Sequence, residues 1–172
     1  TGHAMVSLAR RRKLPAIFLV RTEAAREALG RLGAEHVIVT SAGFTDTLAA
    51  LSDELGATAV FDGVGGDLPG SIAPSLPMNS TIYFYGFLGG ATPFSMPSVL
   101  VMMKNLTLRR FSNFDSRTVK EQDKLAAALK ALEGAMDDPM LMTRIGKEFS
   151  LDQIELAMTY ESPGGAKAVL VA

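Results

Sequence analysis

The segment PAIFLVRTEAARE (residues 15–27) joins a run of five apolar residues to a helical pattern, with an arginine between them. The apolar run at residues 16–20 has the length and the β-branched and aromatic content of a buried strand. Thr22 is suited to cap the helix that follows, because its hydroxyl can accept a hydrogen bond from a backbone N–H of the first turn. The segment therefore predicts a strand that ends at Arg21 and a helix that begins directly after it.

The same alternation of strand and helix continues along the chain. Apolar runs of strand length follow at residues 36–39, 58–61, 81–85 and 106–111. Segments with helical spacing lie between them, such as the one that ends at Gly56. Strands that alternate with helices at this spacing predict right-handed crossovers and a parallel sheet with helices on both faces. We therefore expect an α/β fold with a doubly wound, Rossmann-like parallel sheet.

The two ends of the chain depart from this alternation. Residues 2–13 have the apolar stripe of a helix and no strand comes before them, so we expect the first strand of the sheet to be absent and the chain to be a fragment. Ser150 and Gln153 form a capping box for a short helix, and residues 168–171 indicate a final strand. We divide the chain into a dinucleotide-binding domain over residues 1–136, incomplete at its N-terminus, and a C-terminal segment over residues 137–172.

The composition argues against several classes of function. The chain has 172 residues, of which 48% are hydrophobic, and its formal net charge of −1 does not favour binding to nucleic acid or to an anionic membrane surface. It has no cysteine and only two histidines, which leaves no cysteine zinc site and no histidine-rich metal site. No apolar run approaches the roughly 20 residues of a membrane span. We expect a soluble, cytoplasmic protein without a metal. Ser7 and Ser52 lack the sequence context of a hydrolase nucleophile.

Arg21 lies at the position where a dinucleotide-binding fold contacts the adenosine ribose. In such folds the residue that ends the second strand lies about 20 positions after the last glycine of the phosphate loop. Gly2 and Arg21 are 19 positions apart. An acidic residue at this position would bind the ribose hydroxyls of NAD, whereas a guanidinium would bind the 2′-phosphate of NADP. An isolated charged residue at a strand end more often only faces water, so Arg21 needs further support.

Two glycine-rich turns supply that support. FDGVGG (residues 61–66) and YGFLGG (residues 85–90) each follow a predicted strand. Parallel strands bring their carboxyl ends to one edge of the sheet, which is where ligands bind in open α/β folds. Glycine would let the backbone of these turns approach a flat ring or a pyrophosphate closely. Either turn alone could be an ordinary turn, but the two together with Arg21 favour a nucleotide site.

With these features together, the chain resembles the cofactor-binding domain of the medium-chain dehydrogenase/reductase superfamily, in the zinc-independent branch of quinone oxidoreductases and 2-enoyl thioester reductases. The resemblance rests on the order and spacing of several segments rather than on one motif. These segments are GHAMVSLARRRKLPAIFLVRTEAAREALGRLGAEHVI, LGATAVFDGVGG, STIYFYGFLGG, NLTLRRF and GAKAVLVA.

The resemblance implies that NADPH is the cofactor. Gly2 would lie at the pyrophosphate, at the N-terminus of a helix, and Arg21 with Thr22 would hold the 2′-phosphate. The other implied cofactor-binding residues follow three strands: Phe61, Asp62, Gly63 and Val64 beside the adenosine and its ribose, and Tyr85, Gly86, Phe87, Leu88, Phe111 and Ser112 beside the nicotinamide. The residues themselves suggest a simpler role for Asp62, as a carboxylate that forms the turn.

The resemblance also implies what the rest of the enzyme contributes. The family has its substrate-binding domain upstream, so we assign no catalytic residue and expect the chain by itself to be inactive. The closing segment would pack on that domain near Lys167, and the edge strand at residues 106–111 would form a homodimer. The implied reaction is transfer of hydride from NADPH to a small electrophilic substrate, a quinone, an enone or an enoyl thioester.

Two other functions remain open on the sequence. A non-catalytic nucleotide-binding or scaffold module with a Rossmann-like fold would show the same pattern. A methyltransferase-like fold that binds adenosylmethionine would instead have an acidic residue at the position of Arg21, because its ligand carries a free ribose diol. The methionine-rich residues 96–103 indicate core or interface packing rather than a metal site.

Overall fold

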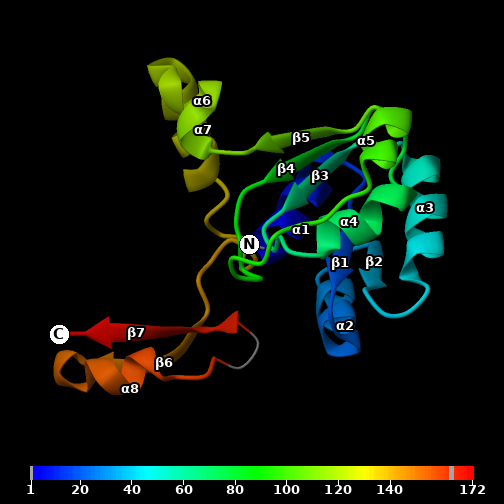
Figure 1. Cartoon of the computed structure of the whole chain (residues 1–172). Coiled ribbons are helices and arrows are strands. Elements are labelled where there is room, and N and C mark those ends of the chain that lie inside the picture. Colours follow the sequence, from blue (N-terminus) through cyan, green and yellow to red (C-terminus); the bar gives the residue numbers. More distant parts are fainter. Residues whose placement is uncertain (1, 163–164) are drawn as a thin grey trace.

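The computed structural model describes residues 2–162 and 165–172 (Figure 1). Its helices are α1 (Gly2–Arg12), α2 (Glu23–Arg31), α3 (Phe44–Leu55), α4 (Leu68–Ile72), α5 (Ser98–Lys104), α6 (Arg117–Lys120), α7 (Gln122–Glu133) and α8 (Ile154–Met158). Its strands are β1 (Ile17–Val20), β2 (His36–Val39), β3 (Ala59–Asp62), β4 (Thr81–Phe84), β5 (Thr107–Arg110), β6 (Ile145–Ser150) and β7 (Lys167–Val171). The α/β fold predicted from the sequence is confirmed, and each of the apolar runs forms a strand.

The strands pair in parallel throughout. β1 pairs with β2, β3–β4–β5 form a three-stranded sheet, and β6 pairs with β7. In the three-stranded sheet Val60, Ile82 and Leu108 stand side by side, so these positions face the same way. The next row along the strands, which includes Phe61 and Tyr83, faces the opposite way.

One layer of helices covers both of the first two sheets. Ile17 and Leu19 of β1, Ile38 of β2 and Val60 of β3 all pack in a single apolar cluster. The cluster is closed by residues of α3 and α4, among them Leu48 and Ile72. A second cluster, built around Ile82, continues this layer under β4 and β5. The two sheets therefore share a core although no hydrogen bonds join them in the described residues.

The sheet is split between β1 and β3. Among the residues that the structure describes, β1 pairs only with β2, and β3 pairs only with β4. Both strands thus keep an unpaired inner edge while their faces rest on the same helices. The expected parallel sheet is therefore present as two separately hydrogen-bonded parts.

The loop after the second glycine-rich turn is held down on α4. The carbonyl oxygen of Ser95 lies so close to Gly70 that a Cβ there would be 2.0 Å from it. At the far end of this segment, the Lys104 ammonium donates to the carbonyl oxygens of Pro74 and Leu76, at 2.6 and 2.7 Å. These contacts hold the segment that leads from β4 into α5 and β5. Met96 packs in the core, as predicted for its segment, whereas Met102 and Met103 are exposed.

The last third of the chain departs from the sequence predictions in two places. The leucine spacing at residues 125, 129 and 132 predicts one long helix over about residues 118–136. The structure has two helices there, α6 and α7, because Glu121 has an extended backbone between them. β6 was not expected at all, since residues 145–150 contain no apolar run. The capping box of Ser150 and Gln153 is confirmed and opens the short turn before α8. β6, α8 and β7 form a βαβ unit around the buried Phe149 (Figure 1).

The described helices include none that is long and apolar enough to cross a membrane.

Candidate functional site

Arg21 and Thr22 lie directly after β1, as the sequence predicts. The pairing of β1 with β2 ends in a bond from the Thr40 N–H to the carbonyl oxygen of Val20, at 2.8 Å. Thr22 then has an extended backbone, and its hydroxyl oxygen accepts a hydrogen bond from the Ala25 N–H at 3.2 Å. The cap fixes where α2 begins, and so it fixes Arg21 at the carboxyl end of the strand.

The Arg21 side chain is exposed and carries a charge that the fold does not use. The nearest acidic residue along the helix, Glu23, is paired with Arg26. No hydrogen bond or ion pair to Arg21 is present within the described part of the chain. A cation in this position is available to an anion from outside the protein.

The two glycine-rich turns lie against each other at the carboxyl ends of β3 and β4. The N–H of Tyr85 donates to the carbonyl oxygen of Asp62 at 2.8 Å. Two further bonds follow, from Leu88 to Gly63 at 2.9 Å and from Gly89 to Val64 at 2.8 Å. Backbone hydrogen bonds therefore join the two turns beyond the end of the strand ladder, and the turns form one surface.

The Asp62 side chain stabilises the first glycine-rich turn by accepting hydrogen bonds from its backbone. This side chain is buried, and one carboxylate oxygen accepts from the Val64 N–H at 2.8 Å. The other oxygen accepts from the Gly65 N–H at 3.1 Å. Two backbone donors that would otherwise be unpaired in a tight turn are thereby satisfied. The role of a turn-forming carboxylate, suggested by the sequence, is confirmed.

Glycine is required in these turns for a reason that the sequence did not indicate. A Cβ on Gly63 would lie 2.6 Å from the ring of Tyr85, and a Cβ on Gly86 would lie 3.0 Å from the carbonyl oxygen of Gly63. A Cβ on Gly89 would lie 2.9 Å from the carbonyl oxygen of Val64. The close approach that these glycines permit is between the two turns rather than toward open space.

Aromatic and apolar side chains surround this edge of the sheet. The rings of Phe61 and Phe111 meet edge to face, with centroids 5.6 Å apart, and both are about half exposed. The Phe111 N–H donates to the carbonyl oxygen of Phe84 at 2.7 Å and so brings Phe111 and Ser112 to the end of β4. Phe87 and Leu88 are 80% and 88% exposed at the tip of the second turn. These residues offer an apolar surface that the described part of the chain leaves exposed.

The structure gathers the predicted site residues into three groups. The first is Gly2, which begins α1 and has open space around its Cβ position. The second is Arg21 with Thr22, and the third consists of the two turns with Phe111 and Ser112. No hydrogen bond or ion pair joins one group to another in the residues described.

Two cavities in the described part of the chain are lined by none of the predicted site residues. The larger, of about 430 Å³, is at the amino ends of β1 and β2 and is lined by Arg10, Lys13, Phe18 and His36 among others. The smaller, of about 290 Å³, lies beside β2 between α2 and α3.

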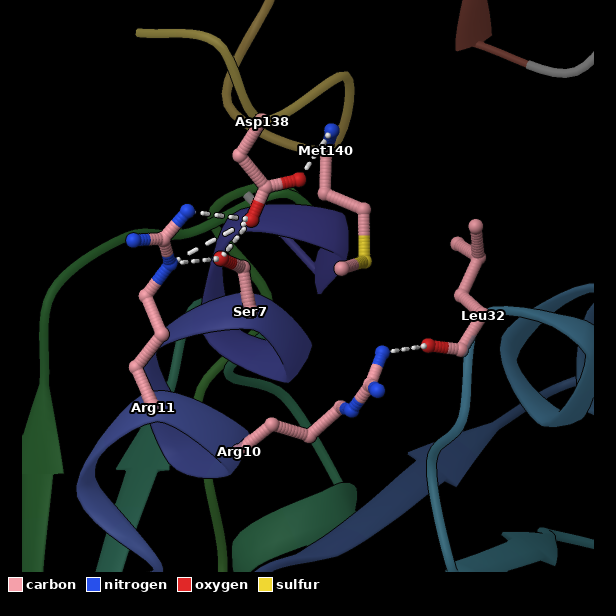
Figure 2. Close-up of polar contacts among 6 residues, drawn as sticks. All are labelled: Ser7, Arg10, Arg11, Leu32, Asp138 and Met140. Carbon is pink, nitrogen blue, oxygen red and sulfur yellow. Dashed lines mark hydrogen bonds and ion pairs between the residues drawn. The ribbon is translucent and has the colours of Figure 1, made fainter. Parts of the chain in front are cut away.

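A polar cluster of Ser7, Arg11 and Asp138 was missed by the sequence reasoning (Figure 2). The pKa of Asp138 lies below its ordinary value, chiefly because the Ser7 hydroxyl and the Met140 N–H donate to the carboxylate, with Arg11 adding to the effect. No local signal in the sequence marks Ser7 as buried on α1.

The described residues offer no group of side chains that could bind a metal ion. Across residues 2–162 and 165–172, no three side chains of histidine, cysteine, aspartate or glutamate are grouped so that they could hold an ion.

The sequence and the fold were compared with known proteins. The family model for zinc-binding dehydrogenases matches residues 1–131. No curated protein sequence matches the chain. Among solved structures, a candidate NADPH:quinone reductase from Mesorhizobium loti is similar with a TM-score of 0.77 and 16% identity, over 99% of this chain and 49% of that one.

Two further solved structures show the same fold. An enoyl thioester reductase mutant from Candida tropicalis is similar with a TM-score of 0.73 and 21% identity, over 88% of this chain and 44% of that one. A mycobacterial protein complexed with NADPH is similar with a TM-score of 0.66 and 19% identity, over 88% of this chain and 47% of that one. The chain thus spans about half the length of the structures it matches.

Proposed function

The chain belongs to the zinc-binding dehydrogenase family, and we propose that it is the NADPH-binding part of an oxidoreductase that transfers hydride to a quinone, an enone or an enoyl thioester. Solved structures of the same fold support this class of cofactor and substrate: one is a complex with NADPH, and another is a complex with NADP and crotonyl-CoA.

The zinc in the family's description has no counterpart in the residues described, as the absence of a grouped donor set indicates.

The exposed guanidinium of Arg21 is the observation that carries the proposal. It stands at the carboxyl end of β1, unpaired within the described residues, directly before the cap of α2. A doubly charged 2′-phosphate would find there a cation whose charge no carboxylate of the described fold neutralises. The Thr22 hydroxyl accepts the capping bond from Ala25 and keeps its own hydrogen to donate to the same phosphate.

The N-terminus of α1 is suited to the pyrophosphate. A helix leaves the backbone N–H groups of its first turn without intrahelical partners, and its dipole favours an anion there. The first turn of α1 contains no acidic residue to compete for this position. At Gly2, nothing within 4 Å would obstruct a close approach to the backbone. Gly2 is therefore our proposed pyrophosphate contact.

The apolar edge of the second sheet would hold the nicotinamide half. When bound, NADPH supplies the hydride that reduces the electrophilic carbon or the quinone. Phe87 and Leu88, at the exposed tip of the second turn, would cover one side of the reacting groups and exclude water from them. Phe111 offers a flat apolar face on the nicotinamide side, and Phe61, which it meets edge to face, would lie on the adenosine and ribose side. Asp62 would act indirectly, by keeping the first turn in shape.

Two exposed surfaces of the chain are suited to assembly with other protein parts. The four residues of β5 are exposed and pair only with β4 in the described chain, so we propose that this edge joins two copies in a homodimer. We also propose that residues 137–172 pack toward a substrate domain. The exposed Ile154, Leu156 and Met158 of α8 are the kind of surface that such a domain would cover.

Arg21→Gln in the full-length protein tests the cofactor assignment. The substitution removes the charge-assisted hydrogen bonds to the 2′-phosphate, and this loss should weaken NADPH binding by about ten- to a hundredfold. NADH has no 2′-phosphate, so its binding should stay the same. The matched control is Arg31→Gln, at the other end of α2, which should change neither affinity. Isothermal titration with each dinucleotide measures both. Equal losses for NADPH and NADH, or no loss, would show that Arg21 does not read the phosphate.

A further inference from the structure

One carboxylate joins the C-terminal part of the chain to its first helix. Asp138 lies in the linker between α7 and β6, at residues 134–144, and it faces α1 (Figure 2). The Ser7 hydroxyl donates to its Oδ2, and Arg11 Nη2 lies 3.2 Å from the same oxygen. Arg11 Nε in turn lies 3.3 Å from the Ser7 oxygen, so the three side chains form a closed triangle.

No other polar contact in the described residues makes this connection. Every hydrogen bond and ion pair that joins residues 2–112 to residues beyond 133 ends on Asp138. The two buried apolar clusters do not make it either, since their members come from residues 17–106. The unit of β6, α8 and β7 has its own small core around Phe149.

The Asp138 carboxylate is rigidly connected to the linker that carries it. Its second oxygen, Oδ1, accepts from the Met140 N–H at 2.9 Å. Its carbonyl oxygen accepts from the Leu141 N–H at 2.9 Å, and its N–H donates to Ala135 at 3.0 Å. Residues 135–141 of the linker therefore form a compact turn around the carboxylate.

The partners on α1 are equally constrained. Ser7 is 1% exposed in the middle of an eleven-residue helix, so its hydroxyl has little freedom to find another acceptor. Arg11 follows one turn later on the same face and supplies a charge that the buried hydroxyl lacks. A neutral donor and a cation thus converge on one carboxylate oxygen.

We propose that Ser7, Arg11 and Asp138 form a latch that fixes the unit of β6, α8 and β7 in one position relative to α1. With the latch closed, the linker holds that unit at a set angle to the helix. With the latch open, the unit keeps its own fold but turns about residues 134–144. The latch is a property of this chain and requires neither a cofactor nor a substrate.

Spin labels measure the position of the unit directly, because the chain contains no cysteine to interfere. Glu54→Cys on α3 and Glu155→Cys on α8 place labels at two exposed sites in the 172-residue chain. Pulsed dipolar spectroscopy should give a single narrow distance distribution for this pair. Ser7→Ala and Arg11→Gln, made in the labelled background, should each replace it with a broad distribution.

Matched controls separate the latch from a general loss of stability. Ser52→Ala removes a serine that is also 1% exposed in a helix, and Arg12→Gln removes the neighbouring arginine. Both should keep the narrow distribution. Circular dichroism of every variant shows whether it is folded. If Ser7→Ala unfolds the chain, Arg11→Gln still tests the latch, because Arg11 is half exposed and its substitution should leave the fold intact. A broad distribution in the parent chain, equal broadening in the controls, or a narrow distribution in Arg11→Gln would each overturn the proposal.

Discussion

The backbone N–H of Tyr85 donates to the carbonyl oxygen of Asp62 at 2.8 Å, one residue beyond the last pair of β3 and β4. Because two further backbone hydrogen bonds join the turns, from Leu88 to Gly63 and from Gly89 to Val64, the two glycine-rich turns cannot move independently. A ligand that touches one turn therefore meets a surface whose shape depends on both. The first two predictions concern what maintains that surface.

Asp62→Ala should destabilise the fold. The substitution leaves the N–H groups of Val64 and Gly65 without an acceptor in a closed turn, which we expect to lower the free energy of unfolding by about 1 to 3 kcal/mol. Asp62→Asn keeps one acceptor oxygen and should cost less. Urea unfolding measures both. Asp67→Ala is the control, since the Asp67 side chain makes no capping bond, and a similar loss there would contradict the proposed role of Asp62.

Gly70→Ala and Gly30→Ala should have opposite effects although both glycines are helical. A Cβ on Gly70 would lie 2.0 Å from the Ser95 carbonyl oxygen, so the loop that follows the second turn must shift, at a cost of about 1 to 3 kcal/mol. Gly30 has no atom within 4 Å of its Cβ position, and alanine there should stabilise α2 by about 0.5 to 1 kcal/mol. Thermal unfolding compares the two, and a stable Gly70→Ala protein would mean that the loop does not rest on α4.

The contribution of Asp138 to stability should depend on pH. Its folded pKa lies below the ordinary value, mainly through the Ser7 hydroxyl, so the folded state favours the ionised form. The stabilisation is then fully present above about pH 4, the unfolded pKa, and is lost as the pH falls through the folded pKa. Unfolding measured for the parent chain and for Asp138→Asn should differ at neutral pH and converge in acid. A difference that stays constant with pH would be contrary to this linkage, and Asp137→Asn serves as the neighbouring control.

The parts of the fold that the sequence predicted are those with local causes. The apolar run before Arg21 and the cap at Thr22 depend on residues a few positions apart, and both are as expected. The break at Glu121 was missed because the leucine spacing of α7 continues a helical pattern across it. Of these leucines, Leu129 and Leu132 are half exposed, so little packing enforces one long helix. β6 was missed because it buries only Phe149 and owes its existence to pairing with β7.

The candidate site was predictable to the same extent. Residue types and strand ends indicated which residues reach the carboxyl edge of the second sheet. They did not indicate that the Tyr85 ring occupies the space at Gly63, since this contact depends on how two turns from different strands meet. The partners Ser7 and Asp138 are 131 positions apart, and no spacing rule connects them in a single sequence.

The split between β1 and β3 has a consequence for handling the molecule. Each inner edge presents a row of backbone donors and acceptors with no partner in the described residues, and such rows recruit strands from neighbouring molecules. Concentrated preparations of the 172-residue chain should consequently precipitate or form ordered aggregates. A short peptide of β-branched residues, added in excess, should compete for those edges and keep the protein in solution.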